Sequence, residues 1–184
     1  ARMNKLEESK QDFARLFQLQ PRNAFFIHRL GTIEAIQGNS VQALNFFRQA
    51  LQINPNLTDV INDIIVVYFN QGDRQGALSE LEKLAGESTA QEIYHLFKGR
   101  VLVANEDYVE AEREFRKAIE INPEYYQAYM MLGQLKVLQG DLDQAIQEVD
   151  ALIQQKPDFS PAFLLKAYYF DASKKPEEAI ALYR

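Results

Sequence analysis

Apolar side chains recur along this chain at spacings of three and four residues. Ile27 and Leu30 show this spacing in one segment, and Ala43, Phe47 and Ala50 show it in the next. Such a period places apolar residues on one side of an α-helix, whereas a strand would alternate them at every second position. The pattern therefore predicts amphipathic helices and no strands.

The helices belong to a repeat of 34 residues. Five alanines stand at that interval: Ala43, Ala77, Ala111, Ala145 and Ala179. A large apolar residue follows each of them after four positions: Phe47, Leu81, Phe115, Val149 and Tyr183. Glycines share the same phase, at Gly31, Gly99 and Gly133 and again at Gly38, Gly72 and Gly140. Several residue types that keep one period indicate a repeat architecture, with a pair of helices as its unit.

Glycine and proline mark the expected helix ends. Gly38, Gly72 and Gly140 are each followed by Asn or Asp, which predicts a left-handed residue and then a side chain able to cap the next helix. Proline disfavours helical geometry in the residue before it and cannot donate a hydrogen bond to a continuing helix. The second helices are therefore expected to close at Asn54-Pro55, Asn122-Pro123 and Lys156-Pro157.

These residues resemble the tetratricopeptide repeat family, whose pattern has an aromatic residue, Leu-Gly and Tyr in the first helix, Ala and Phe in the second, and a closing Pro. One unit carries the pattern most fully, with Tyr129, Leu132, Gly133, Gly140, Ala145 and Pro157. The resemblance implies an all-α fold, a right-handed α-solenoid of stacked antiparallel helix pairs. It divides residues 1–184, as a single array, into a lone second helix at 3–20, complete repeats at 24–57, 58–91, 92–125 and 126–159, and a truncated repeat at 160–184.

Two of these repeats depart from the family pattern. The second complete repeat has Ile65 where the first glycine belongs and lacks a closing proline. The third has His95 in the aromatic position, Lys98 in the leucine position and Glu106 in place of the turn glycine. Neither end of the chain shows the polar capping helix with which repeat arrays normally finish. We interpret the chain as a fragment of a longer protein.

The resemblance also implies where a partner binds. In this family the first helix of each pair lines a concave groove, which holds a peptide or a helical segment of a partner protein. The groove positions fall on Phe25, His28, Arg29, Asn62, Asp63, Val66, Phe69, Ile93, Leu96, Phe97, Arg100, Met130, Met131, Gln134, Val137, Leu164, Leu165 and Tyr168. They further include Thr32, Ile36, Asp59, Asn70, Val103, Gln127, Leu138 and Asp171. The prediction is a protein-binding scaffold or adaptor.

The predicted groove changes character along the chain. Its N-terminal part is polar and of mixed charge, whereas its C-terminal part is rich in Leu, Met and Phe, which suits an amphipathic helix or an apolar peptide. An opposite interpretation stays open, in which Leu96, Met130 and Leu164 are core residues. Some family members bind a C-terminal carboxylate through Lys and Asn residues. Here Asp63 stands among those positions and would repel a carboxylate, so we expect no such binding.

Composition limits the other functions. With a net charge of −6 and scattered Lys and Arg, the chain lacks the positive field that a nucleic acid requires. The absence of cysteine removes thiolate catalysis, and His28 and His95 lie in different repeats, which is poor spacing for a shared metal. No segment approaches the roughly 20 apolar residues that cross a bilayer. We expect no enzymatic activity, no cofactor, no metal and no direct membrane insertion.

The most charged segment is predicted to be a solvated helix face with ion pairs on its surface. It comprises Glu110, Glu112, Arg113, Glu114, Arg116, Lys117 and Glu120.

Three alternatives to a free-standing adaptor stay open. In the first, the array is the substrate-recruiting domain of a larger multidomain enzyme. In the second, it is a bacterial envelope factor for pilus assembly or polysaccharide export. In the third, it associates with itself through its open ends. The compartment, cytoplasmic or periplasmic, is undetermined because a chain without cysteine is compatible with either.

Overall fold

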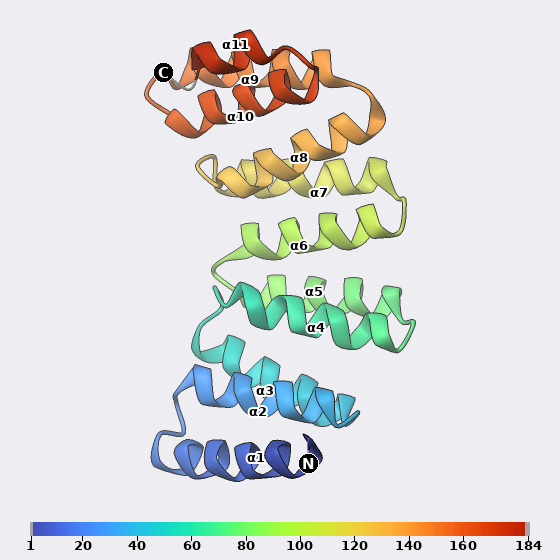
Figure 1. Ribbon diagram of the computed structural model, residues 1–184, viewed down its shortest axis with the longest axis vertical. Helices are drawn as coiled ribbons and strands as arrows, with labels where there is room; N and C mark the ends of the chain where they lie inside the picture. Colours follow the sequence, from blue (N-terminus) through green and yellow to red (C-terminus); the bar gives the residue numbers. More distant parts are fainter. Residues whose placement is uncertain (1, 183–184) are drawn as a thin grey trace. The chain divides into compact units, whose positions relative to one another are not determined.

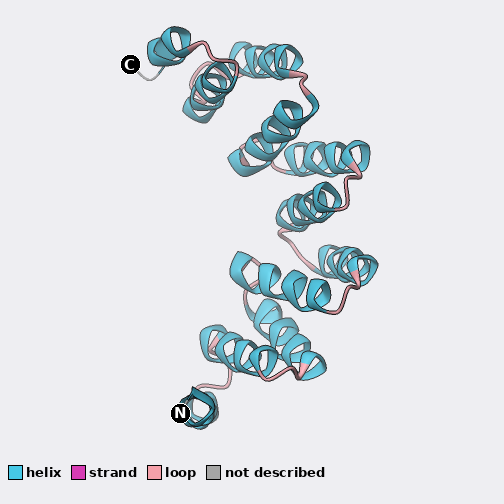
Figure 2. Ribbon diagram, turned by 45° about the vertical axis from the view of Figure 1, so that its right-hand side comes forward, coloured by secondary structure: helices cyan, strands magenta, loops and turns pink. Residues whose placement is uncertain are grey.

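The computed structural model describes residues 2–182, and every regular element within that range is an α-helix. Figure 1 labels the helices along the chain, and Figure 2 shows that only short loops connect them. The helices are α1 (Arg2–Leu19), α2 (Ala24–Ile36), α3 (Ser40–Ile53), α4 (Thr58–Asn70), α5 (Arg74–Glu87), α6 (Gln91–Ala104), α7 (Tyr108–Ile121), α8 (Tyr126–Gln139), α9 (Leu142–Gln155), α10 (Ser160–Ala172) and α11 (Pro176–Leu182). The all-α prediction is confirmed. Ala1, Tyr183 and Arg184, which the predicted array includes, lie outside the described residues.

The chain folds as two compact units, one up to Ile93 and the other from Tyr94. In unit 1, α2 packs against α1, α3 and α4, and α4 also packs against α5. In unit 2, α8 packs against α7 and α9, while α10 packs against α8, α9 and α11. Consecutive helices from α1 to α5 and from α7 to α11 are therefore packed as neighbours, as in a helical repeat.

The turns inside the hairpins share one conformation. Gly38, Gly72 and Gly140 have φ values of 83°, 72° and 82°, so the predicted left-handed positions are confirmed. Glu106 and Lys174 stand at the same phase and keep the conformation, with φ values of 65° and 60°. The next residue in each turn donates its N–H to the carbonyl five positions back at 2.8–3.0 Å, in Asn39, Asp73, Asp107, Asp141 and Lys175. The geometry of the turn is thus preserved even where glycine is missing.

The expected proline closures are also confirmed. Helices α3, α7 and α9 end immediately before Asn54, Asn122 and Lys156, each of which precedes a proline. Asn54 and Asn122 have extended backbones, with φ values of −141° and −132°. Proline disfavours the helical region for the residue before it, which explains why the helices stop there.

The repeating alanines form the centre of the packing. Ala43, Ala77, Ala111, Ala145 and Ala179 are all buried. Beside them, a Cβ atom at Gly31 would lie 2.6 Å from the ring of Phe47, and one at Gly99 would meet the ring of Phe115. The ring occupies the space that a larger side chain would need. Glycine in the first helix and phenylalanine in the second therefore fit as a pair.

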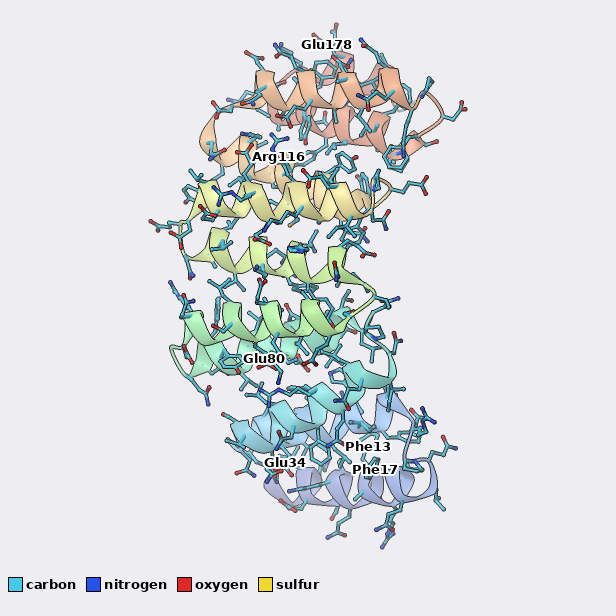
Figure 3. The ribbon with its side chains drawn as sticks, turned by 180° about the vertical axis from the view of Figure 1, so that it is seen from behind. Phe13, Phe17, Glu34, Glu80, Arg116 and Glu178 are labelled. Carbon is cyan, nitrogen blue, oxygen red and sulfur yellow. The ribbon has the colours of Figure 1, made fainter. Side chains whose placement is uncertain are left out.

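Buried carboxylates recur with the same period, at Glu80 and Glu114. In unit 1, Arg48 donates to Glu80 from Nε at 2.6 Å and from Nη2 at 2.8 Å (Figure 3 labels Glu80). Burial, the largest single influence, raises the pKa of Glu80, but the hydrogen bonds and charge of Arg48 together with the hydrogen bond from Tyr68 lower it below its ordinary value. In unit 2, Arg116 donates to Glu148, 34 residues after Glu114, at 2.7 Å. These bonds tie α3 to α5 and α7 to α9.

The charged segment in α7 is not a uniformly solvated face. The prediction holds for Glu110 and Arg113, an exposed pair, but Glu114 is only 7% exposed. Its Oε2 lies 2.6 Å from Nδ1 of His95, and an ionised carboxylate can only accept, so that nitrogen carries the hydrogen. Burial alone would raise the pKa of Glu114, but the hydrogen bond from His95 and the charge of Lys98 lower it to about 2. The sequence period does not reveal which charged residues lie inside.

Candidate partner-binding surfaces

The predicted contact residues of unit 1 lie mainly on α2 and α4. Nε2 of His28 lies 2.8 Å from Oδ2 of Asp63, and the hydroxyl of Thr32 lies 3.3 Å from the same oxygen. The Thr32 hydroxyl also lies 3.1 Å from the carbonyl of His28, and its single hydrogen serves one acceptor at a time. These bonds join two first helices and hold the Asp63 side chain in place. Asn62 beside it is exposed.

An open hollow of ≈ 470 Å³ lies beside this network between α2 and α4. Its lining residues are Thr32, Ala35, Ile36, Gly38, Ser40, Asp63, Val66, Val67, Asn70 and Gln71. Ile36 and Val66 are 66% and 46% exposed, so apolar surface is open to solvent here. Asp63 and Val66, both predicted groove residues, therefore line the same hollow.

Aromatic side chains of α1 and α2 pack together near the start of α2. Phe25 is 59% exposed, and its ring meets that of Phe13 edge to face at 6.3 Å (Figure 3 labels Phe13). The guanidinium of Arg29 lies over the Phe13 ring at 5.7 Å. Near the C-terminal end of α4, the guanidinium of Arg74 lies over the ring of Phe69 at 5.6 Å. Both arginines leave their charged heads at the surface.

Unit 2 has a second hollow, of ≈ 380 Å³, between α6 and α8. Its lining residues are Arg100, Val103, Phe115, Met131, Gln134, Leu135 and Leu138. The guanidinium of Arg100 stacks over the ring of Phe97 at 4.8 Å, and Leu138 is 59% exposed. Five of the seven lining residues are groove positions that the sequence predicts. The hollow combines apolar walls, a flexible thioether and one cation.

Four predicted contact residues lie in the interior instead of on a surface. Ile93, Leu96, Phe97 and Leu165 are between 1% and 8% exposed. A buried side chain offers little area to a partner, so these four do not enter the surface proposed below. Their positions on the first helices are those of the groove, but each also meets the core because a first helix is packed on several sides.

The remaining C-terminal residues divide between core and surface. Met130 and Tyr168 are half-buried and pack against a core of Ala145, Val149, Leu165 and Tyr169. Leu164 is 47% exposed, and Val137 is half-buried. The interpretation of this stretch as core therefore applies to Leu96 and partly to Met130, but Leu164 is open to solvent.

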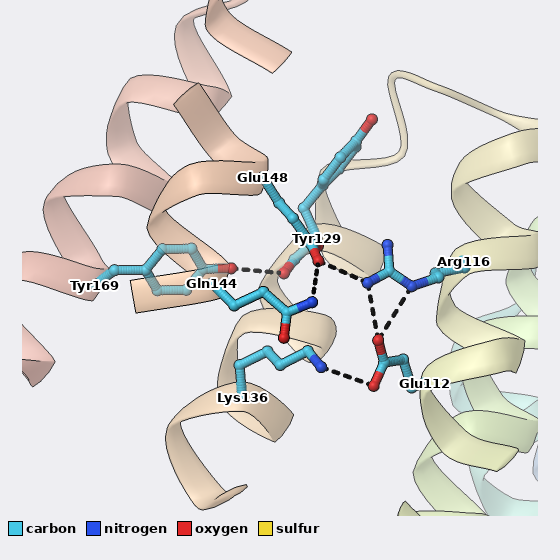
Figure 4. Close-up of polar contacts among 7 residues, drawn as sticks. All are labelled: Glu112, Arg116, Tyr129, Lys136, Gln144, Glu148 and Tyr169. Atoms are coloured by element: carbon cyan, nitrogen blue, oxygen red, sulfur yellow. Dashed lines mark hydrogen bonds and ion pairs between the residues drawn. The ribbon is translucent and has the colours of Figure 1, made fainter. Parts of the chain in front are cut away.

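Sequence reasoning missed a polar network in unit 2. Glu112 accepts hydrogen bonds from Lys136 at 2.8 Å and from Arg116, which also reaches Glu148 (Figure 4). Lys136 is only 4% exposed, an unusual position for a lysine. One signal was available, because Glu80, Glu114 and Glu148 share the 34-residue interval and Arg48 and Arg116 each precede a Glu by 32.

Across residues 2–182, no group of three or more His, Cys, Asp or Glu side chains is placed to hold a metal ion. In the same part of the chain, none of the helices is long and apolar enough to span a bilayer.

Comparison with known proteins identifies the repeat. The family model described as tetratricopeptide repeat matches residues 35–101 and 102–167, which is more than half of the chain. Photosystem I assembly protein Ycf3 of Rippkaea orientalis is 26% identical over 108 residues, which are 59% of this chain and 56% of that protein. The matched region thus spans about half the length of the Ycf3 relatives.

Solved structures resemble the fold at low identity. BtubC from P. vanneervenii aligns with a TM-score of 0.58 and 17% identity, covering 97% of this chain and 85% of that one. PilW, a type IV pilus biogenesis factor, aligns with a TM-score of 0.57 and 18% identity, covering 98% of this chain and 84% of that one. At these identities the likeness concerns the fold alone.

Proposed function

Because this chain belongs to the tetratricopeptide repeat family, we propose that it binds segments of other polypeptides on its first helices and acts as a scaffold or adaptor. The proposal gives the chain a binding role without a reaction of its own. The binding surfaces are the hollow between α2 and α4 in unit 1 and the hollow between α6 and α8 in unit 2.

The unit 2 hollow is the observation that carries this proposal. Its open walls come from residues at the groove positions of the family, and Met131 and Leu138 offer apolar contact next to the cation of Arg100. A methionine side chain adapts to different shapes, and apolar area removed from water supplies most of the affinity of such contacts. These features suit an apolar or amphipathic helical segment whose polar side reaches Arg100.

A relative's printed role agrees with a scaffold. Ycf3 is named as an assembly protein for photosystem I, and such a role requires contacts with other polypeptides. Since the identity is 26% over part of each chain, this resemblance supports the class of function and leaves the partner to experiment.

Site-specific photo-crosslinking tests the proposal. A benzoylphenylalanine placed at Leu138 or Val66, on the proposed surfaces, is expected to capture partner polypeptides from the source cell. The matched controls are Val109 on α7 and Val41 on α3, which are 71% and 72% exposed and lie outside both hollows. Met131→Glu should remove the crosslinks at position 138. Equal capture from the control positions would place the partner on the second helices and overturn the proposal.

A further inference from the structure

We propose that the unit 1 hollow binds the side chain of a lysine or arginine from the partner segment. This inference rests on the proposed function, because it names the residue class that one of the two surfaces selects. Three features around this hollow between α2 and α4 support the inference. They are a carboxylate oxygen that accepts no hydrogen bond, the C-terminal ends of two helices, and apolar walls.

Asp63 supplies the negative charge. Its side chain is 34% exposed, and both donors that reach it, His28 and Thr32, lie near the same oxygen, Oδ2. Among the described residues no hydrogen bond to Oδ1 of Asp63 is found, so that oxygen is available to a ligand. A fixed, partly buried carboxylate binds a cation more strongly than a mobile one in water.

The helix ends around the hollow also favour a positively charged ligand. Ile36 is the last residue of α2 and Asn70 is the last residue of α4, and both line the hollow. The C-terminal end of a helix carries a partial negative charge from its aligned peptide dipoles. Here the turn N–H groups of Gly38 and Asn39 after α2, and of Gly72 and Asp73 after α4, already donate to carbonyls of the last helical turns. Two such ends and one carboxylate favour a cation, and the lining includes no Lys or Arg that could compete for the place.

The walls match the rest of a basic side chain. Ile36, Val66 and Val67 offer apolar surface, and Asn70 and Gln71 add polar side chains to the lining. Lysine and arginine bury their methylene stems on such a surface while the charged head reaches a polar group. A purely apolar side chain would cover the free oxygen of Asp63 without a hydrogen bond, and an acidic one would be repelled.

The unit 2 hollow is an internal contrast. Arg100 is among its lining residues, and no Asp or Glu is. The two hollows should therefore differ in charge preference, although both are built from first helices.

A peptide array with single-residue changes tests the inference. The probes are amphipathic 15-residue peptides of Leu, Ala and Ser that differ only at a central Arg, Lys, Gln or Glu. The wild-type protein should bind the Arg and Lys peptides about tenfold more tightly than the Gln peptide, as one charge-assisted hydrogen bond implies. Asp63→Asn keeps an oxygen for His28 and Thr32 but loses the charge, so it should bind the Arg, Lys and Gln peptides alike.

Asp59→Asn is the matched control, because Asp59 is an exposed residue of the same helix outside the hollow. This variant loses the same charge but should keep the preference. In a second variant, Val66→Lys, a lysine of the chain itself occupies the hollow and should remove the preference while Asp63 is intact; Val66→Gln should not. Thermal unfolding followed by circular dichroism verifies that each variant is folded.

The results separate the two proposals. Binding without a preference for Arg and Lys, or a preference that survives in Asp63→Asn, overturns the basic-residue inference and leaves the proposed function standing. The inference also fails if no peptide of the array binds while crosslinking from position 66 succeeds. If crosslinking from the proposed surfaces fails as well, the proposed function is overturned with it.

Discussion

The hairpins α2–α3 and α8–α9 have the same pattern but are completed in different ways. Both place a glycine in the first helix, Gly31 or Gly133, and a buried alanine in the second. In α2–α3 the ring of Phe47, from the same hairpin, fills the space beside Gly31. In α8–α9 the corresponding residue is Val149, which has no ring, and Tyr169 of α10 lies against Gly133 instead.

The difference shows how a repeat array distributes its stability. Tyr169 belongs to the core of unit 2 with Val149, and its hydroxyl donates to the carbonyl of Tyr129 at 3.4 Å (Figure 4). Burial raises the pKa of Tyr169, as expected for a phenol taken out of water. Hairpin α2–α3 therefore contains its own central ring, whereas α8–α9 depends on the following helix.

The largest effect should come from removing these rings. Phe47→Ala and Tyr169→Ala should each lower the free energy of unfolding by about 3–5 kcal/mol, since each deletes a buried aromatic side chain. Val149→Ala should cost only about 1–2 kcal/mol, because it removes less volume. Urea unfolding followed by circular dichroism measures all three. If Val149→Ala proved as costly as Tyr169→Ala, the assignment of the central ring to α10 would be wrong.

The next effect is the difference between a buried ion pair in unit 1 and an exposed ion pair in unit 2. Arg48→Met should lower the free energy of unfolding by about 2–3 kcal/mol, because it leaves the buried carboxylate of Glu80 without its main partner. Arg113→Met removes an exposed pair with Glu110 and should change stability by less than about 0.5 kcal/mol. Thermal unfolding of both variants provides the comparison. Equal losses would show that the burial of Glu80 has no energetic consequence.

The buried carboxylate of Glu114 in unit 2 should make the stability of that unit depend on pH. The pKa of Glu114 is lowered to about 2 in the folded state, below its unfolded value near 4.5. Its contribution is therefore present above about pH 4.5 and is lost as the pH falls toward 2, with a total on the order of 3 kcal/mol. Glu114→Gln should weaken this dependence of unit 2 stability, measured by hydrogen exchange in α7. An unchanged pH profile would contradict the assignment.

A smaller loss is expected where a glycine meets a ring. Gly31→Ala should destabilise unit 1 by about 1.5 kcal/mol, because the new Cβ would lie 2.6 Å from Phe47 and the ring must move. Gly86 in α5 is the matched control, since nothing lies within 4 Å of a Cβ built there. Gly86→Ala should be neutral or slightly stabilising because alanine favours a helix. Melting temperatures measure both changes, and the same decrease in both would contradict the close fit at Gly31.

The smallest effect is a gain. Glu106 adopts a φ of 65° in the turn where three of the other repeats have Gly38, Gly72 or Gly140. Glu106→Gly should stabilise unit 2 by about 0.5–1 kcal/mol, because glycine occupies the left-handed region without the Cβ penalty. Asp107→Gly, at the following position with an ordinary φ of −85°, should not stabilise the fold. Chemical unfolding of the two variants tests whether the turn conformation carries this strain.

Much of the fold could be predicted because it follows from local rules. A three- to four-residue apolar spacing specifies helices, a left-handed glycine ends them, and proline acts on its immediate neighbour. Such effects act within a few residues of the chain. The repeat at 92–125 was predicted although Glu106 replaces its turn glycine, and the structure shows that Glu106 adopts the left-handed conformation there.

The candidate surfaces were predicted less completely because they depend on which helices meet. Val66 and Leu165 are both groove positions by sequence, yet one is 46% exposed and the other 1%. Exposure is decided by neighbours from distant parts of the chain, which a period does not specify. For the same reason the partners of His28 and His95 came only from the structure, since each carboxylate lies on another helix.

The sequence by itself determined that this protein is a 34-residue helical repeat with a fixed type of turn, because backbone hydrogen bonds and side-chain periodicity act locally. Only the tertiary structure decided which ring completes each hairpin, which carboxylates are buried and where two hollows stay open. These outcomes depend on volume and charge balanced among helices that pack together, as Phe47 in one hairpin and Tyr169 beside another demonstrate.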